Sequence, residues 1–255
     1  MPEQVQVQTQ VRRAMAMEWF RLRTLRSTWL ITGLCLLASA GLALAIVLVE
    51  GDVVDADLAR SVLNPGQPSP LALLLGLLGV LAWGHDSRYG TIRPLLTVLP
   101  DRRVLAVART LVMTAYLLSV VLLCQAAAWV TGLLATGGDL AEFATAEVVL
   151  RNGLGMVVLG LGVGWFGLAL GVLLPSLPAA VATFFIYPAA VEPMISMLLE
   201  KTAGNAHLWL PFGSFGSLIG VDQGGPSPLG AAALFLGAMA LLNLAGLARL
   251  HTRDV

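Results

Sequence analysis

Charge is what this sequence has least of. Only 12% of its 255 residues are charged, about half of the ~25% that is typical of soluble domains. Hydrophobic residues make up 57% of the chain, and the mean hydropathy is +0.83. These values exclude a water-soluble globular domain and predict a membrane protein. We expect no nucleic-acid partner.

Cysteine and lysine are almost absent as well. The two cysteines, Cys35 and Cys124, lie in apolar runs without a CxxC or histidine-rich neighbourhood, so we expect small buried side chains rather than metal ligands. The single lysine, Lys201, follows Glu200, whereas a phosphate-binding loop of the form G-x-x-x-x-G-K-[ST] requires glycine at that place. The chain is therefore predicted to be no enzyme, to hydrolyse no ATP and to hold no cofactor of its own.

Long apolar runs dominate what remains. A run of about twenty residues in a helix reaches ~30 Å, the thickness of the hydrocarbon core of a bilayer. The sequence predicts an all-α integral membrane protein with six transmembrane helices, at 29–49, 69–84, 104–125, 148–174, 179–199 and 228–248. The ends of the second and third helices are left open, because the second is short and the third can extend toward Ala135.

The distribution of basic residues predicts the orientation. With a cytoplasmic N-terminus, twelve of the fifteen Lys and Arg residues fall on the cytoplasmic side, as the positive-inside rule requires. The first outer loop carries acids instead. We therefore expect a multi-pass protein of the plasma membrane with both termini in the cytoplasm.

We expect the first 28 residues to form a cytoplasmic amphipathic segment ahead of a six-span transmembrane domain, residues 29–255. Apolar residues recur on one face at helical spacing, while arginines lie off that face; the apolar set is Val11, Ala14, Met15, Leu22, Leu25 and Trp29. Such a helix is expected in the plane of the inner leaflet. Glu18 interrupts the apolar stripe, which is costly against lipid and less so against protein, so both a membrane anchor and a docking surface remain open.

A second basic stretch, "GHDSRYGTIRPLLTVLPDRR", connects the second and third predicted helices. Glycine and proline divide it into a compact loop, and it is rich in arginine: Arg88, Arg93, Arg102, Arg103 and, just beyond, Arg109. Two interpretations remain open at this point. The loop is a topology signal only, or it also contacts another protein.

These two stretches resemble the permease subunits of ATP-binding-cassette transporters of the ABC-2 type. In that family a basic helix like "MEWFRLRTLRSTW" (17–29) leads into the first span, and a loop of the kind E-Y-x-x-G-T-I-R joins the second and third. Gly90, Thr91, Ile92 and Arg93 match that loop, whereas Asp86 and Ser87 depart from it. The segment "HLWLPFGSFGSLIG" (207–220) before the last span is a further likeness.

The resemblance implies a subunit of an ATP-driven exporter. Two permease subunits, identical or different, would form the pathway in the bilayer, and a separate ATPase subunit would bind ATP and Mg. Two sets of residues would contact that ATPase: the coupling-loop residues Asp86, Arg88, Gly90, Thr91 and Arg93, and the interface-helix residues Glu18, Trp19, Arg23 and Arg26. The substrate is left open.

One ionisable residue lies inside a predicted span. Glu192, in "YPAAVEPMI", is a candidate pathway residue, because carboxylates in membranes are costly and often functional. It could equally pair within the bundle or reach the outer interface. If Glu192 is a pathway residue, a proton-coupled secondary transporter of small molecules is the alternative to the ATP-driven exporter.

Other residues predict helix packing. Gly160, Gly164, Gly167 and Gly171 form one stripe that lets a neighbouring helix approach closely, although the sequence does not identify that helix. Gln125 and Asn243 are expected to make hydrogen bonds between helices. The broken, aromatic segment 207–220 is expected to form a short helix or helical hairpin at the outer interface.

Overall fold

The computed structural model describes the backbone of residues 2–50, 53–63, 70–89, 102–219 and 224–252, and the side chains of most of them. Within these ranges the chain is helical and has no strand. Five helical stretches are long and apolar enough to cross a membrane. The prediction of an all-α membrane protein agrees with this architecture.

The first half of the chain forms α1 (Pro2–Thr24), α2 (Arg26–Glu50), α3 (Ala56–Leu63), α4 (Pro70–Tyr89) and α6 (Arg102–Ala135). The second half forms η1 (Asp139–Phe143), α7 (Ala146–Leu173), α8 (Leu177–Ile186), η2 (Tyr187–Val191), α9 (Glu192–Ala203), η3 (Gly204–Trp209), α10 (Phe215–Ile219) and α11 (Pro228–Thr252). The first, third, fourth and sixth predicted spans lie in α2, α6, α7 and α11. The helix that contains the third predicted span, α6, does extend to Ala135, well beyond the range 104–125.

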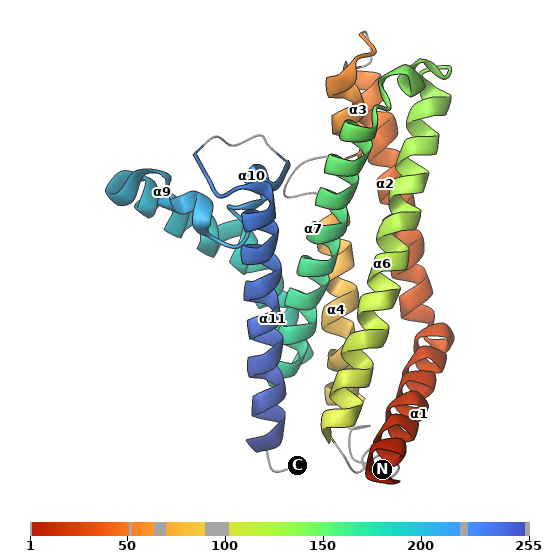
Figure 1. Cartoon of the computed structure of the whole chain (residues 1–255), viewed down its shortest axis with the longest axis vertical. Helices are drawn as coiled ribbons and strands as arrows, with labels where there is room; N and C mark the ends of the chain where they lie inside the picture. Colours follow the sequence, from red (N-terminus) through yellow and green to blue (C-terminus); the bar gives the residue numbers. More distant parts are fainter. Residues whose placement is uncertain (1, 51–52, 64–69, 90–101, 220–223, 253–255) are drawn as a thin grey trace.

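The second and fifth predicted spans differ from a regular membrane helix. The apolar part of α4 that the structure describes, Leu71–Gly84, is shorter than the five long helical stretches. The fifth span changes from α8 to a π-helical turn, η2, and then to α9. Pro188 and Pro193 provide the reason, because each lacks the N–H that an α-helix needs at its position. In Figure 1, α9 leaves the bundle toward the upper left.

Local signals set the start of α7 and the boundary between α7 and α8. The hydroxyl of Thr145 accepts the N–H of Val148 and caps the start of α7. After Leu173 the two prolines of "LPSLP" prevent the helix from continuing. The hydroxyl of Ser176 then accepts the N–H of Ala179 and caps α8. The predicted break between the fourth and fifth spans is confirmed.

The helix α7 is the centre of the bundle. It contacts α4 and α11 most extensively and also packs on α6 and α8. Its most apolar stretch is 72% buried, against 33% or less for the other four long helical stretches. In Figure 1, α1 lies along the lower half of α6, and the start of α1 and the end of α11 lie at the same end of the molecule.

Glycines bring α4 and α7 into backbone contact. A Cβ added at Gly79 would lie 2.1 Å from the carbonyl oxygen of Gly164, and one added at Gly167 would lie 2.1 Å from that of Gly76. Gly167 and Gly171 of the predicted stripe therefore pack on α4 of the same chain, whereas a Cβ added at Gly160 or Gly164 would first meet Val121 or Leu117 of α6. Two polar contacts agree with prediction as well: Gln125 donates to the Gly153 carbonyl at 3.1 Å, and Asn243 donates to the Trp165 carbonyl at 2.9 Å. Both cysteines are buried and free.

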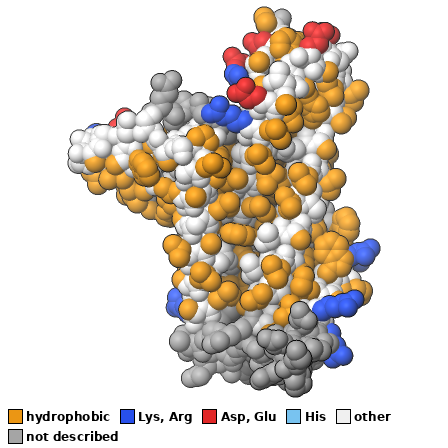
Figure 2. Space-filling view, viewed as in Figure 1, with side chains coloured by type: hydrophobic (Ala, Val, Ile, Leu, Met, Phe, Trp, Pro, Cys, Tyr) orange, Lys and Arg blue, Asp and Glu red, His pale blue; other side chains and the backbone are white. Residues whose placement is uncertain are grey.

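The face of the molecule visible in Figure 2 is rich in apolar side chains. Figure 2 shows apolar side chains over the middle of the visible face, with acidic groups near the end formed by α3 and η1. Many large apolar side chains are exposed, among them Leu37, Leu48, Leu122 and Leu244. Exposed apolar surface of this extent is typical of a membrane or protein contact.

Candidate functional site

A buried ion pair joins α1 to α6. The Nη2 of Arg109 lies 2.6 Å from the Oε1 of Glu18, and its Nε donates to the same oxygen at 3.1 Å. The guanidinium is only 1% exposed and the Glu18 side chain 5%. Both charges therefore lie away from water, where each is stable only with its partner.

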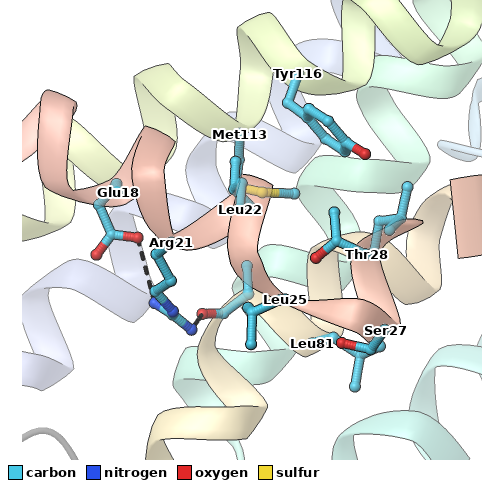
Figure 3. Close-up of a pocket in the computed structure, with 11 residues that line it drawn as sticks. Glu18, Arg21, Leu22, Leu25, Ser27, Thr28, Leu81, Met113 and Tyr116 are labelled. Atoms are coloured by element: carbon cyan, nitrogen blue, oxygen red, sulfur yellow. Dashed lines mark hydrogen bonds and ion pairs between the residues drawn. The ribbon is translucent and has the colours of Figure 1, made fainter. Parts of the chain in front are cut away.

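Arg21 and the end of α4 complete this cluster. Arg21 donates to the Oε2 of Glu18 at 3.2 Å and to the carbonyl oxygen of Ala82 at 2.9 Å (Figure 3). Arg109 donates to the same carbonyl at 3.3 Å, and its guanidinium carbon lies 4.1 Å from the ring centroid of Trp83. An arginine over an aromatic face gains further attraction from the ring. We call these five residues, Glu18, Arg21, Ala82, Trp83 and Arg109, the α1 clamp.

Small side chains place the charges of the α1 clamp. Ala14 of α1 is fully buried against Val104 and Ala108 of α6. Because residues four apart share one face of a helix, Glu18 and Leu22 follow Ala14 into the same contact. The close approach of α1 and α6 at Ala14 thus brings the Glu18 carboxylate to Arg109, which lies two turns inside α6.

The α1 clamp corrects two expectations. Arg109 is not a residue of the connecting loop, because α6 begins at Arg102 and turns Arg109 into the bundle. The apolar stripe does not continue through Trp29, which is 61% exposed, because α1 ends at Thr24 and a new helix starts at Arg26. Ala14 and Leu22 of the stripe are buried against helices of the same chain rather than facing the inner leaflet.

The interface-helix residues divide between two faces. Glu18 points inward to α6 of its own chain, whereas Trp19, Arg23 and Arg26 are exposed. Of the coupling-loop residues, Gly90, Thr91 and Arg93 lie outside the described residues. Asp86 and Arg88 lie in α4, but their side chains are outside the described part as well. Their predicted contact with an ATPase stays a prediction.

Glu192 forms a second polar centre, in the fifth predicted span, at the start of α9. It is 2% exposed. Its Oε1 accepts the backbone N–H groups of Phe212, at 2.6 Å, and Gly213, at 2.8 Å. Its other oxygen, Oε2, is buried and makes no hydrogen bond to the described residues. Of the alternatives that the sequence left open, this geometry favours pairing within the bundle.

Glu192 thereby holds the turn between η3 and α10 inside the bundle. The ring of Phe212, in that turn, lies 5.6 Å from Phe166 of α7 and 5.3 Å from Phe235 of α11, both edge to face. The segment 207–220 does form short helices, as expected. Its aromatic residues are not all interfacial, however, since Phe215 is buried and only Trp209 is largely exposed.

We expect Glu192→Ala to destabilise the protein. The change leaves two partly buried N–H groups without their acceptor, and a buried group that is left unsatisfied costs roughly 1–3 kcal/mol. Glu192→Gln should lose less, because its amide oxygen still accepts. The thermal unfolding midpoint in detergent measures both. Glu200→Ala, on an exposed position of α9, is the matched control, and equal midpoints for Glu192→Ala and Glu200→Ala would contradict this role.

No cluster of three or more His, Cys, Asp or Glu side chains that could hold a metal occurs among the residues searched, which are the described ones. No protein-family model matches the sequence, and the search of the curated proteins found no match.

Proposed function

We propose that this chain is the membrane-spanning permease subunit of an ATP-driven exporter of the ABC-2 type. It crosses the plasma membrane with six helices, both termini are cytoplasmic, and it forms the substrate pathway with a second permease subunit. A separate ATPase subunit binds ATP and Mg. The orientation is supported by the position of twelve of the fifteen basic residues on the cytoplasmic side of this topology.

One observation carries this proposal. The two segments that resemble the family are tied together by the α1 clamp, which joins the basic helix α1 to both helices that flank the loop. Ala82 and Arg109 lie seven residues from the facing ends of α4 and α6, a distance of roughly 10 Å along each helix. A loop that receives force from an ATPase would need such a rigid support.

The physical chemistry of the cluster supports coupled movement. Sliding α1 along α6 would separate buried charges, and an uncompensated buried charge costs ~3–5 kcal/mol. Contacts between leucine side chains, by contrast, could be replaced by similar contacts after such a movement at little cost in free energy. Displacement of α4 and α6 by nucleotide-driven closure of the ATPase would therefore move α1 with them. The ends of three helices act as one body in this mechanism.

The proton-coupled alternative has less support. It would depend on Glu192, because this is the carboxylate identified within a predicted span. That side chain already accepts two backbone N–H groups, which suits an anchoring role. Reconstitution in proteoliposomes separates the two functions, since the exporter requires ATP and its ATPase, whereas the alternative responds to a pH gradient alone.

The coupling loop supplies the decisive experiment. We expect Arg93→Ala and Asp86→Ala to weaken co-purification of the ATPase encoded beside this chain, or to uncouple its ATP hydrolysis from transport. Truncating one partner of a desolvated charged contact costs ~2–5 kcal/mol, whereas membrane insertion should be normal. Arg60→Ala, an exposed arginine paired with Asp57 in α3, is the control. Normal assembly and normal coupled transport in both loop variants would refute docking at this loop.

A further inference from the structure

We propose that a groove beside the α1 clamp binds one anionic phospholipid of the inner leaflet. The groove lies where α1 meets α2, and it continues between α4 and α6 (Figure 3). It is open on one side, and only a small part of it is enclosed. We call the junction of α1 and α2 at Leu25 the elbow, and this groove the elbow groove. The proposal requires membrane insertion but not the transport function proposed above.

The lining of the elbow groove is amphipathic. Apolar side chains from three helices and the elbow form most of it: Leu22, Leu25, Leu78, Leu81 and Met113. Polar groups lie beside them: the paired Glu18 and Arg21, Ser27, Thr28 and the hydroxyl of Tyr116. A ligand with a polar head and an apolar chain matches this division, whereas a wholly polar metabolite would leave the leucines against water.

The surroundings of the elbow place the groove at the level of lipid headgroups. Trp19 is 46% exposed, Phe20 70% and Trp29 61%. Tryptophan concentrates at the boundary between headgroups and acyl chains. The indole N–H of Trp29 donates to the carbonyl of Arg23 at 2.9 Å, which fixes this ring at the junction of α1 and α2.

Charge complementarity selects an anionic headgroup. The stretch from Val11 to Trp29 holds five arginines and a single acid, Glu18. Glu18 is buried in its ion pairs, whereas Arg12, Arg13, Arg23 and Arg26 are exposed outside the lining of the groove. Each basic residue near an anionic membrane surface contributes ~1 kcal/mol, which is about a fivefold change in affinity. A phosphatidylglycerol headgroup fits this field better than a zwitterionic phosphatidylcholine headgroup.

Binding in the elbow groove differs from adsorption by charge alone, because it also depends on the shape of the groove. Adsorption depends on the exposed arginines and is indifferent to what fills the groove. A seated lipid requires the space between Leu25 and Leu81. A substitution that fills this space without altering any charge therefore distinguishes the two.

Native mass spectrometry of the full chain in detergent provides the test, with phosphatidylglycerol and phosphatidylcholine of identical chains as probes. We expect one phosphatidylglycerol to bind at least fivefold more tightly than phosphatidylcholine. Leu25→Trp should weaken that binding about tenfold. Leu30→Trp adds the same ring at a position that is 63% exposed and should leave it unchanged. Equal binding of the two lipids, or equal binding by both variants, would overturn the proposal.

A measurement on the unaltered chain covers the case in which Leu25→Trp does not fold. Phosphatidylglycerol with a photoreactive group on its chain is reconstituted with the protein, irradiated, and its attachment sites are mapped. We expect the adducts in two places, 21–28 and 78–82. Adducts spread evenly over the exposed faces of α2 and α6 would mean that the chain has no lipid site at the elbow.

Discussion

Gly79→Ala is expected to prevent normal packing of the bundle. The added Cβ would lie 2.1 Å from the carbonyl oxygen of Gly164 and 2.9 Å from the backbone nitrogen of Leu168. Both are backbone atoms of α7 and cannot turn aside as a flexible side chain can. Overpacking a core usually costs ~1–3 kcal/mol, and we expect more here, because α4 and α7 must separate along their contact.

The control for this prediction lies in α2. A Cβ added at Gly33 or Gly41 would meet nothing within 4 Å. Alanine favours a helix by about 1 kcal/mol over glycine, so Gly33→Ala should unfold at the same temperature as the wild type or higher. Fluorescence-detected size-exclusion chromatography and a thermal midpoint in detergent report both effects. A similar midpoint for Gly79→Ala and Gly33→Ala would show that the α4–α7 contact is looser than the structure has it.

The positions of the long helices could be predicted because hydropathy is a direct signal of burial in lipid. The glycine stripe on α7 predicted close packing, because four small residues on one face let a neighbouring helix approach closely in a membrane. The partner helix could not be predicted, because periodicity identifies a face but not what covers it. In the structure two helices share that face: α4 packs on Gly167 and Gly171, and side chains of α6 lie closest to Gly160 and Gly164.

Irregular helices were harder to predict. Pro188 and Pro193 both lie in the fifth predicted span, but a proline can kink a helix, end it or be absorbed in a π turn. The structure has a π turn, η2, at the first and the start of α9 at the second. Which outcome occurs depends on where the freed backbone groups find partners, and this is a tertiary property.

The candidate site was predicted in part. The sequence singled out Glu18 as a charge in an apolar stripe and predicted that protein would suit it better than lipid. It did not identify Arg109 as the partner, because that arginine follows a run of other basic residues and was counted with the loop. The signal that could have separated it is its register. Val104, Leu105 and Ala108 precede it at helical spacing and are buried with it.

The α1 clamp carries the other large expected effect. Arg109→Ala leaves one oxygen of Glu18 without its closest cation inside the bundle, and breaking a buried ion pair in this way costs ~3–5 kcal/mol. Glu18→Ala should be the more damaging of the two, because Glu18 accepts from both Arg109 and Arg21. Arg109→Lys should fall between them and the wild type, because an ammonium keeps the charge but not the planar array of donors.

Exposed arginines provide the matched control for these changes. Arg60 pairs with Asp57 on the surface of α3, where the arginine side chain is 55% exposed and the aspartate 80%. A surface pair of this kind contributes ~0–1 kcal/mol, so Arg60→Ala should unfold close to the wild type. Salt should also separate the two pairs, because exposed charges are screened and buried ones much less. The thermal midpoint in detergent, at low and at high salt, measures each contrast. If Arg109→Ala matched Arg60→Ala in midpoint and in salt response, the guanidinium would be solvated in solution, and α1 would not be held to α4 and α6 by charge.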